Sequence, residues 1–186
     1  MHHFILTSIF KGNYLKAMKK LNSLLDKAKS SPFYLWLLNR LLWRMIPFNG
    51  PHKFTILAIS DQDLRILLPY RRTNLNHIKG IHACALATLC EYTCGLQLMN
   101  VLDASAYRII LQKLEMEYVY QAKSAVIASF SLSESQAEEL ILTPLLLADA
   151  VVHTFELTVN DTTGKVICKA SVTWQVKPWS KVRTKV

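Results

Sequence analysis

Apolar residues recur along this chain with two different periods, and each period predicts one kind of element. In residues 14–29 and again in residues 33–46 they return every three or four positions, with lysines or arginines between them. This spacing predicts two amphipathic helices. Pro47, Gly50 and Pro51 then interrupt the pattern, so we place the start of the main domain at residue 47.

After these helices the pattern changes to the alternation of apolar and polar residues that is typical of strands. Asp161 to Gly164 has the composition of a hairpin turn between the last two of these segments. Ser133, with Gln136 three positions later, predicts a capped helix that interrupts the sheet. The predicted strands cover residues 53–59, 63–68, 114–120, 126–132, 151–159 and 166–176.

Residues 80–102 carry a single acid, Glu91, and no base, while most of the other side chains are small or apolar. A helix that is apolar all round lies inside its protein or crosses a membrane. An acid at the centre of a spanning helix costs about 2.5–3.5 kcal/mol on insertion scales. We therefore predict a buried central helix rather than a membrane span.

The predicted order of elements is two strands, one long helix and four strands. An antiparallel sheet buries a single apolar helix on all sides only by curving around it. That α+β arrangement is the hotdog fold. We expect residues 1–46 to form a helical extension, residues 47–177 the hotdog domain, and residues 178–186 a basic tail.

Charge is concentrated at the two ends of the 186-residue chain, whose formal net charge is +9. Residues 1–53 hold nine Lys or Arg against the single acid Asp26, whereas residues 54–176 hold nine bases against twelve acids. A nucleic-acid-binding domain places its basic patch on the folded scaffold, so we expect no nucleic-acid partner. Basic ends suit an anionic membrane surface or serve solubility alone.

The helix predicted at residues 33–46 combines Trp36 and Trp43 with Arg40 and Arg44. Such a helix can lie in a membrane interface, which would give the protein a peripheral membrane contact. Packing against its own domain is the commoner fate of an amphipathic helix. Both interpretations stay open at this stage.

Four cysteines, Cys84, Cys90, Cys94 and Cys168, include three on the predicted central helix and no paired C-x-x-C spacing. We interpret them as reduced, buried residues of a cytoplasmic protein rather than as a disulfide framework. The N-terminus lacks a secretory pattern, because Lys11 interrupts its short apolar stretch.

The candidate chemistry lies around the start of the central helix, where Asn76, His82 and Glu91 are spaced by six and nine positions. This spacing resembles that of hotdog acyl-CoA thioesterases of the phenylacetate-pathway type. It is most similar to an uncharacterised thioesterase-like branch that is known only as a domain of unknown function. The resemblance covers roughly residues 46–177. Ala83 and Cys84 stand where that family usually has two glycines.

The resemblance implies a role for each of these residues. Glu91 would activate water or attack the thioester carbonyl, and the backbone N–H of Ala83 would hold the oxyanion. Asn76 and His82 would position the substrate. In the resembled enzymes the acid and the oxyanion hole come from different subunits, so we expect a homodimer or a dimer of dimers. No metal or redox cofactor is required.

Helical geometry independently supports a site at Glu91. At about 100° per residue, its face is shared mostly by small residues, which leave room for a ligand. Burial should raise the pKa of the carboxyl group towards that of a general base. The residues expected to share this face are Cys84, Ala87, Thr88, Cys94, Gly95 and Leu98.

Several alternatives accompany this site. Glu91 could instead form a structural pair with Arg108 or Tyr118, His82 could be a simple helix cap, and Asn76 could hold its loop by an Asx turn. His77, His82, Cys90 and Cys94 do not have the spacing of a zinc site.

We expect Arg71, Arg72 and Lys79 either to meet the phosphates of coenzyme A or to lie in a solvated loop. Cys84 and Thr88 are expected beside the bound substrate. The sequence thus predicts an acyl-CoA thioester hydrolase. The alternative is a non-catalytic hotdog module that binds acyl groups, and a dehydratase or a structural dimer is a third class.

Overall fold

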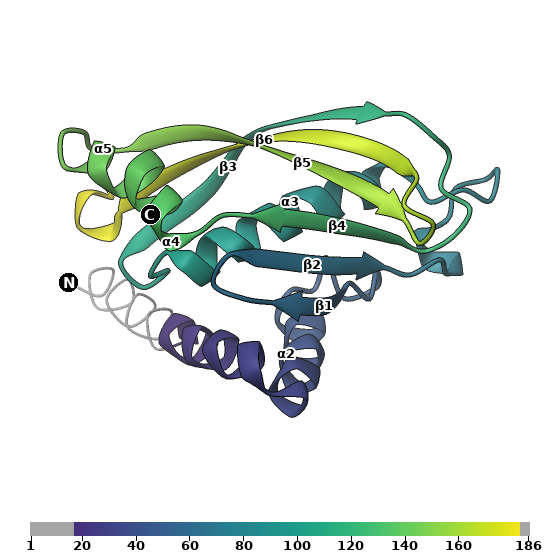
Figure 1. Ribbon diagram of the computed structural model, residues 1–186, viewed down its shortest axis with the longest axis horizontal. Helices are drawn as coiled ribbons and strands as arrows, with labels where there is room; N and C mark the ends of the chain where they lie inside the picture. The colour runs from purple at the N-terminus through teal and green to yellow at the C-terminus, as the bar shows by residue number, and fades with distance from the viewer. Residues whose placement is uncertain (1–16, 183–186) are drawn as a thin grey trace, which may run out of the picture.

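The computed structural model describes residues 17–182 and contains one six-stranded antiparallel sheet (Figure 1). Its strands lie in the order β1-β2-β4-β5-β6-β3, so the two edges are β1 and β3. In chain order they are β1 (Thr55–Ile59), β2 (Asp63–Leu68), β3 (Tyr107–Tyr118), β4 (Val126–Ser131), β5 (Val151–Asp161) and β6 (Val166–Pro178).

The sheet curves around one long helix, α3 (Ala83–Val101), as Figure 1 shows. Leu89, Cys90 and Leu98 of α3 have no exposed surface, because strands cover them. Burial of such side chains contributes most of the stability of a domain of this size. The expected α+β hotdog fold is confirmed.

Turn residues account for the connections that the sequence predicted. The hairpin between β5 and β6 turns at Gly164, whose φ of +89° favours glycine, and the Gly164 N–H donates to the Asp161 carbonyl. Ser133 and Gln136 form the expected capping box at the start of α4 (Glu134–Ala137). A π-helical turn at Glu138–Leu142 and the short α5 (Thr143–Leu145) complete this insertion.

The predicted start of β3 was wrong by seven residues, since the strand begins at Tyr107 rather than at residue 114. Its pairing with β6 shifts register between Leu111 and Lys113, which breaks the simple alternation. The prediction for β2 is confirmed, since the strand runs over Asp63–Leu68 as expected.

Two helices precede the sheet: residues 17–30 are helical, and α2 (Pro32–Met45) follows. Residues 14–16 of the first predicted helix and residues 183–186 of the predicted tail 178–186 lie outside the described residues. The start of that tail is ordered, because β6 extends to Pro178 and a 3-10 turn follows at Trp179–Lys181. On α2, Leu38, Asn39 and Leu42 are buried. The Asn39 side chain accepts from the Ile56 N–H at 2.7 Å and donates to the Ile56 carbonyl at 3.1 Å, which fixes α2 against β1.

The opposite face of α2 stays open to solvent. Phe33 and Trp36 are 63% and 53% exposed, and the Arg40 guanidinium lies over the rings of Trp36 and Trp43. Trp43 itself donates its indole N–H to the Phe54 carbonyl. The helix therefore packs on its own domain and also presents an aromatic and basic surface. None of the helices in residues 17–182 has the length and apolarity needed to cross a membrane.

Candidate active site

The loop before α3 is held by Asn76. Its side-chain oxygen accepts from the backbone N–H groups of Ile78 and Gly80 at 3.1 and 2.9 Å. Lys79 occupies the left-handed region with a φ of 58°. Asn76 therefore forms the Asx turn that was one of its two expected roles.

His82 caps α3, and its ring Nδ1 accepts from the Cys84 N–H at 3.1 Å. The carbonyl of His82 accepts from Ala85 and Leu86. Ala83 is exposed, and its N–H has no hydrogen-bond partner among residues 17–182. An open N–H at the positive end of a helix is a donor for a developing oxyanion.

Glu91 lies two turns further along α3 and is half-buried. Its carboxylate has neither a hydrogen bond nor an ion pair within the described part of the chain. The two structural partners considered for it are used elsewhere: Arg108 donates to Gln175, and Tyr118 donates to the Ala83 carbonyl at 3.1 Å. Burial raises the pKa of Glu91.

The residues beside Glu91 form an incompletely covered stripe on α3. Cys84 is exposed, which corrects the expectation that all four cysteines are buried. Thr88 is half-buried and donates its hydroxyl to the Cys84 carbonyl at 2.8 Å. Cys94 and Leu98, which were expected on this face, are instead fully buried.

Ala83 and Glu91 are separated by eight residues of one straight helix, about 12 Å along its axis. One chain therefore cannot bring both the N–H and the carboxylate to the same carbonyl group.

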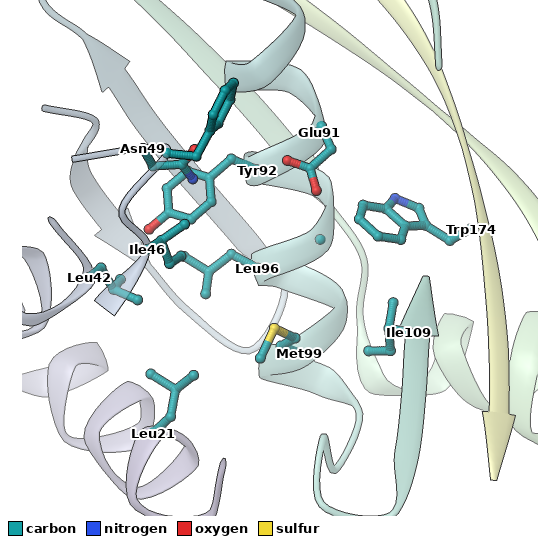
Figure 2. Close-up of a pocket in the computed structure, with 12 residues that line it drawn as sticks. Leu21, Leu42, Ile46, Asn49, Glu91, Tyr92, Leu96, Met99, Ile109 and Trp174 are labelled. Atoms are coloured by element: carbon teal, nitrogen blue, oxygen red, sulfur yellow. The ribbon is translucent and has the colours of Figure 1, made fainter. Parts of the chain in front are cut away.

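Glu91 opens into a pocket of about 350 Å³ between α3, β3, β6 and the N-terminal helices (Figure 2). The polar groups lie at one end of it, where Figure 2 shows Asn49, Tyr92 and Glu91. The other end is apolar throughout. It is formed by Leu21, Leu42, Leu96, Met99 and Ile109, while Ile46 lies nearer to Tyr92.

Trp174 forms the wall beside Glu91 and packs against Gly95. Its indole N–H is buried and lies near the Cys94 sulfur, a weak acceptor whose pKa this contact lowers against the larger effect of burial. Burial raises the pKa of Cys94 to about 12 and also raises the pKa of Tyr92, in both cases with a contribution from the Glu91 charge. Neither group is therefore an acid or base at neutral pH.

Sequence reasoning did not include Trp174 or the N-terminal residues Leu21, Leu42 and Ile46 in the site. A signal for Trp174 existed, because the alternation in β6 places it on the same face as other inward residues. Nothing local connects Leu21 to Glu91, which is 70 positions away.

The basic residues expected at coenzyme A lie before α3. Arg71, Arg72 and Lys79 are exposed, and the Tyr70 hydroxyl donates to the Lys79 carbonyl, which joins the two parts of the loop. Within residues 17–182 no group of three or more His, Cys, Asp or Glu could hold a metal ion.

The sequence profile of a domain of unknown function, DUF4442, matches residues 35–176. The chain belongs to the DUF4442 family. Its fold is the hotdog fold described above. No curated protein sequence is significantly similar to this DUF4442 chain.

Solved structures share the fold at low sequence identity. A Pseudomonas aeruginosa protein of unknown function, described as a "probable thioesterase", is 22% identical with a TM-score of 0.70, over 76% of this chain and 94% of that one. A Staphylococcus aureus thioesterase is 16% identical with a TM-score of 0.56, over 71% and 99%. A Haemophilus influenzae thioesterase is 11% identical with a TM-score of 0.57, over 75% and 87%.

Proposed function

We propose that this DUF4442 protein hydrolyses an acyl-CoA thioester. The observation that carries the proposal is Glu91, an unpaired and half-buried carboxylate at the polar end of an otherwise apolar pocket. A buried acid without a partner is costly, so its retention at this position favours a functional role.

In the proposed reaction Glu91 takes a proton from a water molecule whose oxygen bonds to the carbonyl carbon, or the carboxylate attacks that carbon itself. The resulting oxyanion accepts a hydrogen bond from the Ala83 N–H of a second chain. Collapse then breaks the carbon–sulfur bond and expels the thiolate of coenzyme A, which takes up a proton. In the second route, water hydrolyses the acyl-Glu91 anhydride. His82 and Asn76 keep the helix start and its loop in place.

The pairing of Ala83 with a partner's Glu91 requires a homodimer or a dimer of dimers. Its basis is the separation of about 12 Å along α3. The edge strand β3 lies beside the Glu91 stripe and supplies Tyr118 to the start of α3. A second copy that pairs there would cover the stripe.

Relatives of the same fold support the assignment of the acid. Two of the solved structures are of one Staphylococcus aureus protein, which one of them names a thioesterase. One structure has a glutamine replaced by alanine, and the other has a glutamate 15 positions later replaced by alanine. Asn76 and Glu91 have the same separation.

We also assign Arg71, Arg72 and Lys79 to the phosphates of coenzyme A. We assign the reaction to the cytoplasm, where free cysteines stay reduced.

A turnover screen tests the proposal. The purified protein is offered acyl-CoA thioesters of graded chain length, and release of the free thiol is followed. The proposal is supported if the parent turns over a thioester, if Glu91→Gln abolishes this turnover, and if the control Glu139→Gln, at an exposed residue, retains it. No turnover of any thioester, or equal turnover by Glu91→Gln, would overturn it.

A second candidate is a non-catalytic module that binds acyl groups at a membrane surface. It is favoured by Ala83 and Cys84, where the resembled enzymes have glycines, and by the exposed aromatic and basic face of α2. This candidate predicts binding of acyl-CoA without hydrolysis.

A further inference from the structure

The wall of the pocket opposite α3 comes from the N-terminal extension. Leu21 belongs to the helix over 17–30, and Leu42 and Ile46 come from the end of α2 and the residue after it. Leu21 lies outside the part of the chain that matches the family, which begins at residue 35. The extension thus closes a space that the hotdog domain alone would leave open.

The pocket has a direction. Its polar end offers hydrogen-bonding groups in Glu91 and Asn49. The apolar end around Leu21 and Met99 offers none, so a ligand with one polar end and one hydrocarbon end fits in one orientation (Figure 2).

The length and volume of the pocket limit the length of the hydrocarbon chain that it can hold. Glu91, Gly95 and Met99 are spaced by four residues each on α3, so the pocket follows the helix for about 12 Å. A methylene group is about the size of a water molecule, which takes up about 30 Å³. The pocket volume of about 350 Å³ therefore holds on the order of ten methylene groups. Aliphatic leucine, isoleucine and methionine side chains line this end rather than polar groups that would orient a substituted ring.

We infer that the pocket is a medium-chain fatty-acyl site whose far end is closed by the N-terminal extension. This inference rests on the proposed function for the position of the thioester, which lies at Glu91. The acyl chain of about eight to ten carbons runs along α3 towards Met99. Leu21 and Met99 then set the longest chain that fits.

Variants at the closed end test this inference. Leu21→Phe and Met99→Phe add volume far from Glu91, and Leu24→Phe adds the same volume to the first helix at a position that does not line the pocket. Hydrolysis of acetyl-CoA and octanoyl-CoA is measured for each. We expect the ratio of octanoyl to acetyl kcat/KM to fall at least tenfold in Leu21→Phe and Met99→Phe, because a hydrophobic pocket discriminates about 10- to 200-fold per methylene group. In Leu24→Phe the ratio should stay at the parent's value.

A binding experiment separates this inference from the proposed function. Calorimetric titration of octanoyl-CoA into Glu91→Gln protein reports binding without chemistry, and unfolding temperatures verify that each variant is folded. The affinity for octanoyl-CoA is then compared between the Glu91→Gln protein and the Leu21→Phe/Glu91→Gln double variant. An affinity at least tenfold weaker in the double variant would support the acyl site even if the parent hydrolyses nothing. Turnover that is independent of chain length, or ratios and affinities that Leu21→Phe and Met99→Phe leave unchanged, would overturn the acyl site while leaving hydrolysis in place.

Discussion

Gly95 lies directly against the indole ring of Trp174: a Cβ atom at Gly95 would come within 2.9 Å of the Cη2 and Cζ2 atoms of that ring. The contact joins the central helix to β6 one turn beyond Glu91. Trp174 is only 5% exposed, so the ring has little room to withdraw. The absence of a side chain at residue 95 therefore determines the shape of the pocket beside the carboxylate.

Gly95→Ala should destabilise the fold. Alanine gains up to about 1 kcal/mol of helix propensity over glycine, but overpacking in a core typically costs about 1–3 kcal/mol. We expect a net loss of up to about 2 kcal/mol in the free energy of unfolding, measured with urea. Trp174→Phe removes the clashing ring atoms, so the double variant should lose less than the sum of the two single losses. Strict additivity would contradict the proposed contact.

Glu91→Gln should separate stability from activity. Turnover should fall by about 10²–10⁴, the usual contribution of a general base. The free energy of unfolding should hold or rise, because the carboxylate has no cation to leave behind within residues 17–182. A structural ion pair would instead predict a loss of about 3–5 kcal/mol. Thermal unfolding and thiol release on the same sample distinguish the two outcomes.

The raised pKa of Glu91 predicts how stability depends on pH. Between the ordinary glutamate pKa of about 4.3 and its raised value, the folded chain retains a proton that the unfolded chain has released. Stability contributed by this group is therefore lost as pH rises through that window, and the loss is complete above the raised pKa. The stability of Glu91→Gln relative to the parent should thus increase with pH across the window. A difference that does not change with pH would contradict the raised pKa.

Ala83→Pro should remove the oxyanion donor and spare the helix. Proline lacks the N–H, is favoured at the first position of a helix, and follows a residue in the extended region without strain. Ala83 is that first position, and His82 has a φ of −65° and a ψ of 137°. We expect turnover to fall about 10²–10³-fold, with circular dichroism and the unfolding temperature close to the parent's. Parent-like turnover would exclude the Ala83 N–H as the donor.

Mixing Ala83→Pro and Glu91→Gln chains tests the two-chain site. If each site combines Ala83 of one chain with Glu91 of the other, half of the dimers in an exchanged equimolar mixture contain one intact site. Roughly 25% of the parent's activity should then return on mixing. Activity that stays at the level of the inactive variants, or a monomer in sedimentation at micromolar concentration, would contradict the shared site.

The exposed face of α2 predicts binding to anionic membranes. Replacing Phe33 and Trp36 by serine should weaken binding to phosphatidylserine vesicles at least tenfold and leave the fold intact, since both side chains are more than half exposed. Leu147→Ser, at a 95% exposed residue beyond α5, is the matched control. Point variants are preferable to truncation at residue 46, which would also remove Leu21 and Leu42 from the pocket. Equal vesicle binding by all three proteins would exclude this surface as a membrane contact.

Much of the fold followed from local pattern. The apolar composition of residues 80–102, with one acid and no base, was sufficient to predict a buried helix. The turn residues from Asp161 to Gly164 were sufficient to place a hairpin. The start of β3 was missed because the register shift after Leu111 makes apolar residues run on instead of alternating. A bulge is set by pairing with another strand, which a single segment of sequence does not reveal.

The site was only partly predictable for a similar reason. Glu91 was identified because one acid in an apolar helix is a local anomaly, and its spacing from His82 is also local. The pocket is not local: it combines Leu21, Glu91 and Trp174, which are separated by 70 and 83 positions. Only the docking of the N-terminal helices on the sheet and α3 brings them together.

The hydrogen bonds of Asn39 have a consequence for how copies of this chain can associate. Exposed strand edges are templates for uncontrolled growth of a sheet. At β1 the Asn39 amide already occupies both the N–H and the carbonyl of Ile56, so that edge cannot accept another strand in its middle. Two copies that meet through β3 would therefore leave only blocked edges facing outward. If copies associate through β3, association by strand pairing would end at a closed pair, and the blocked β1 edge would oppose growth into fibres.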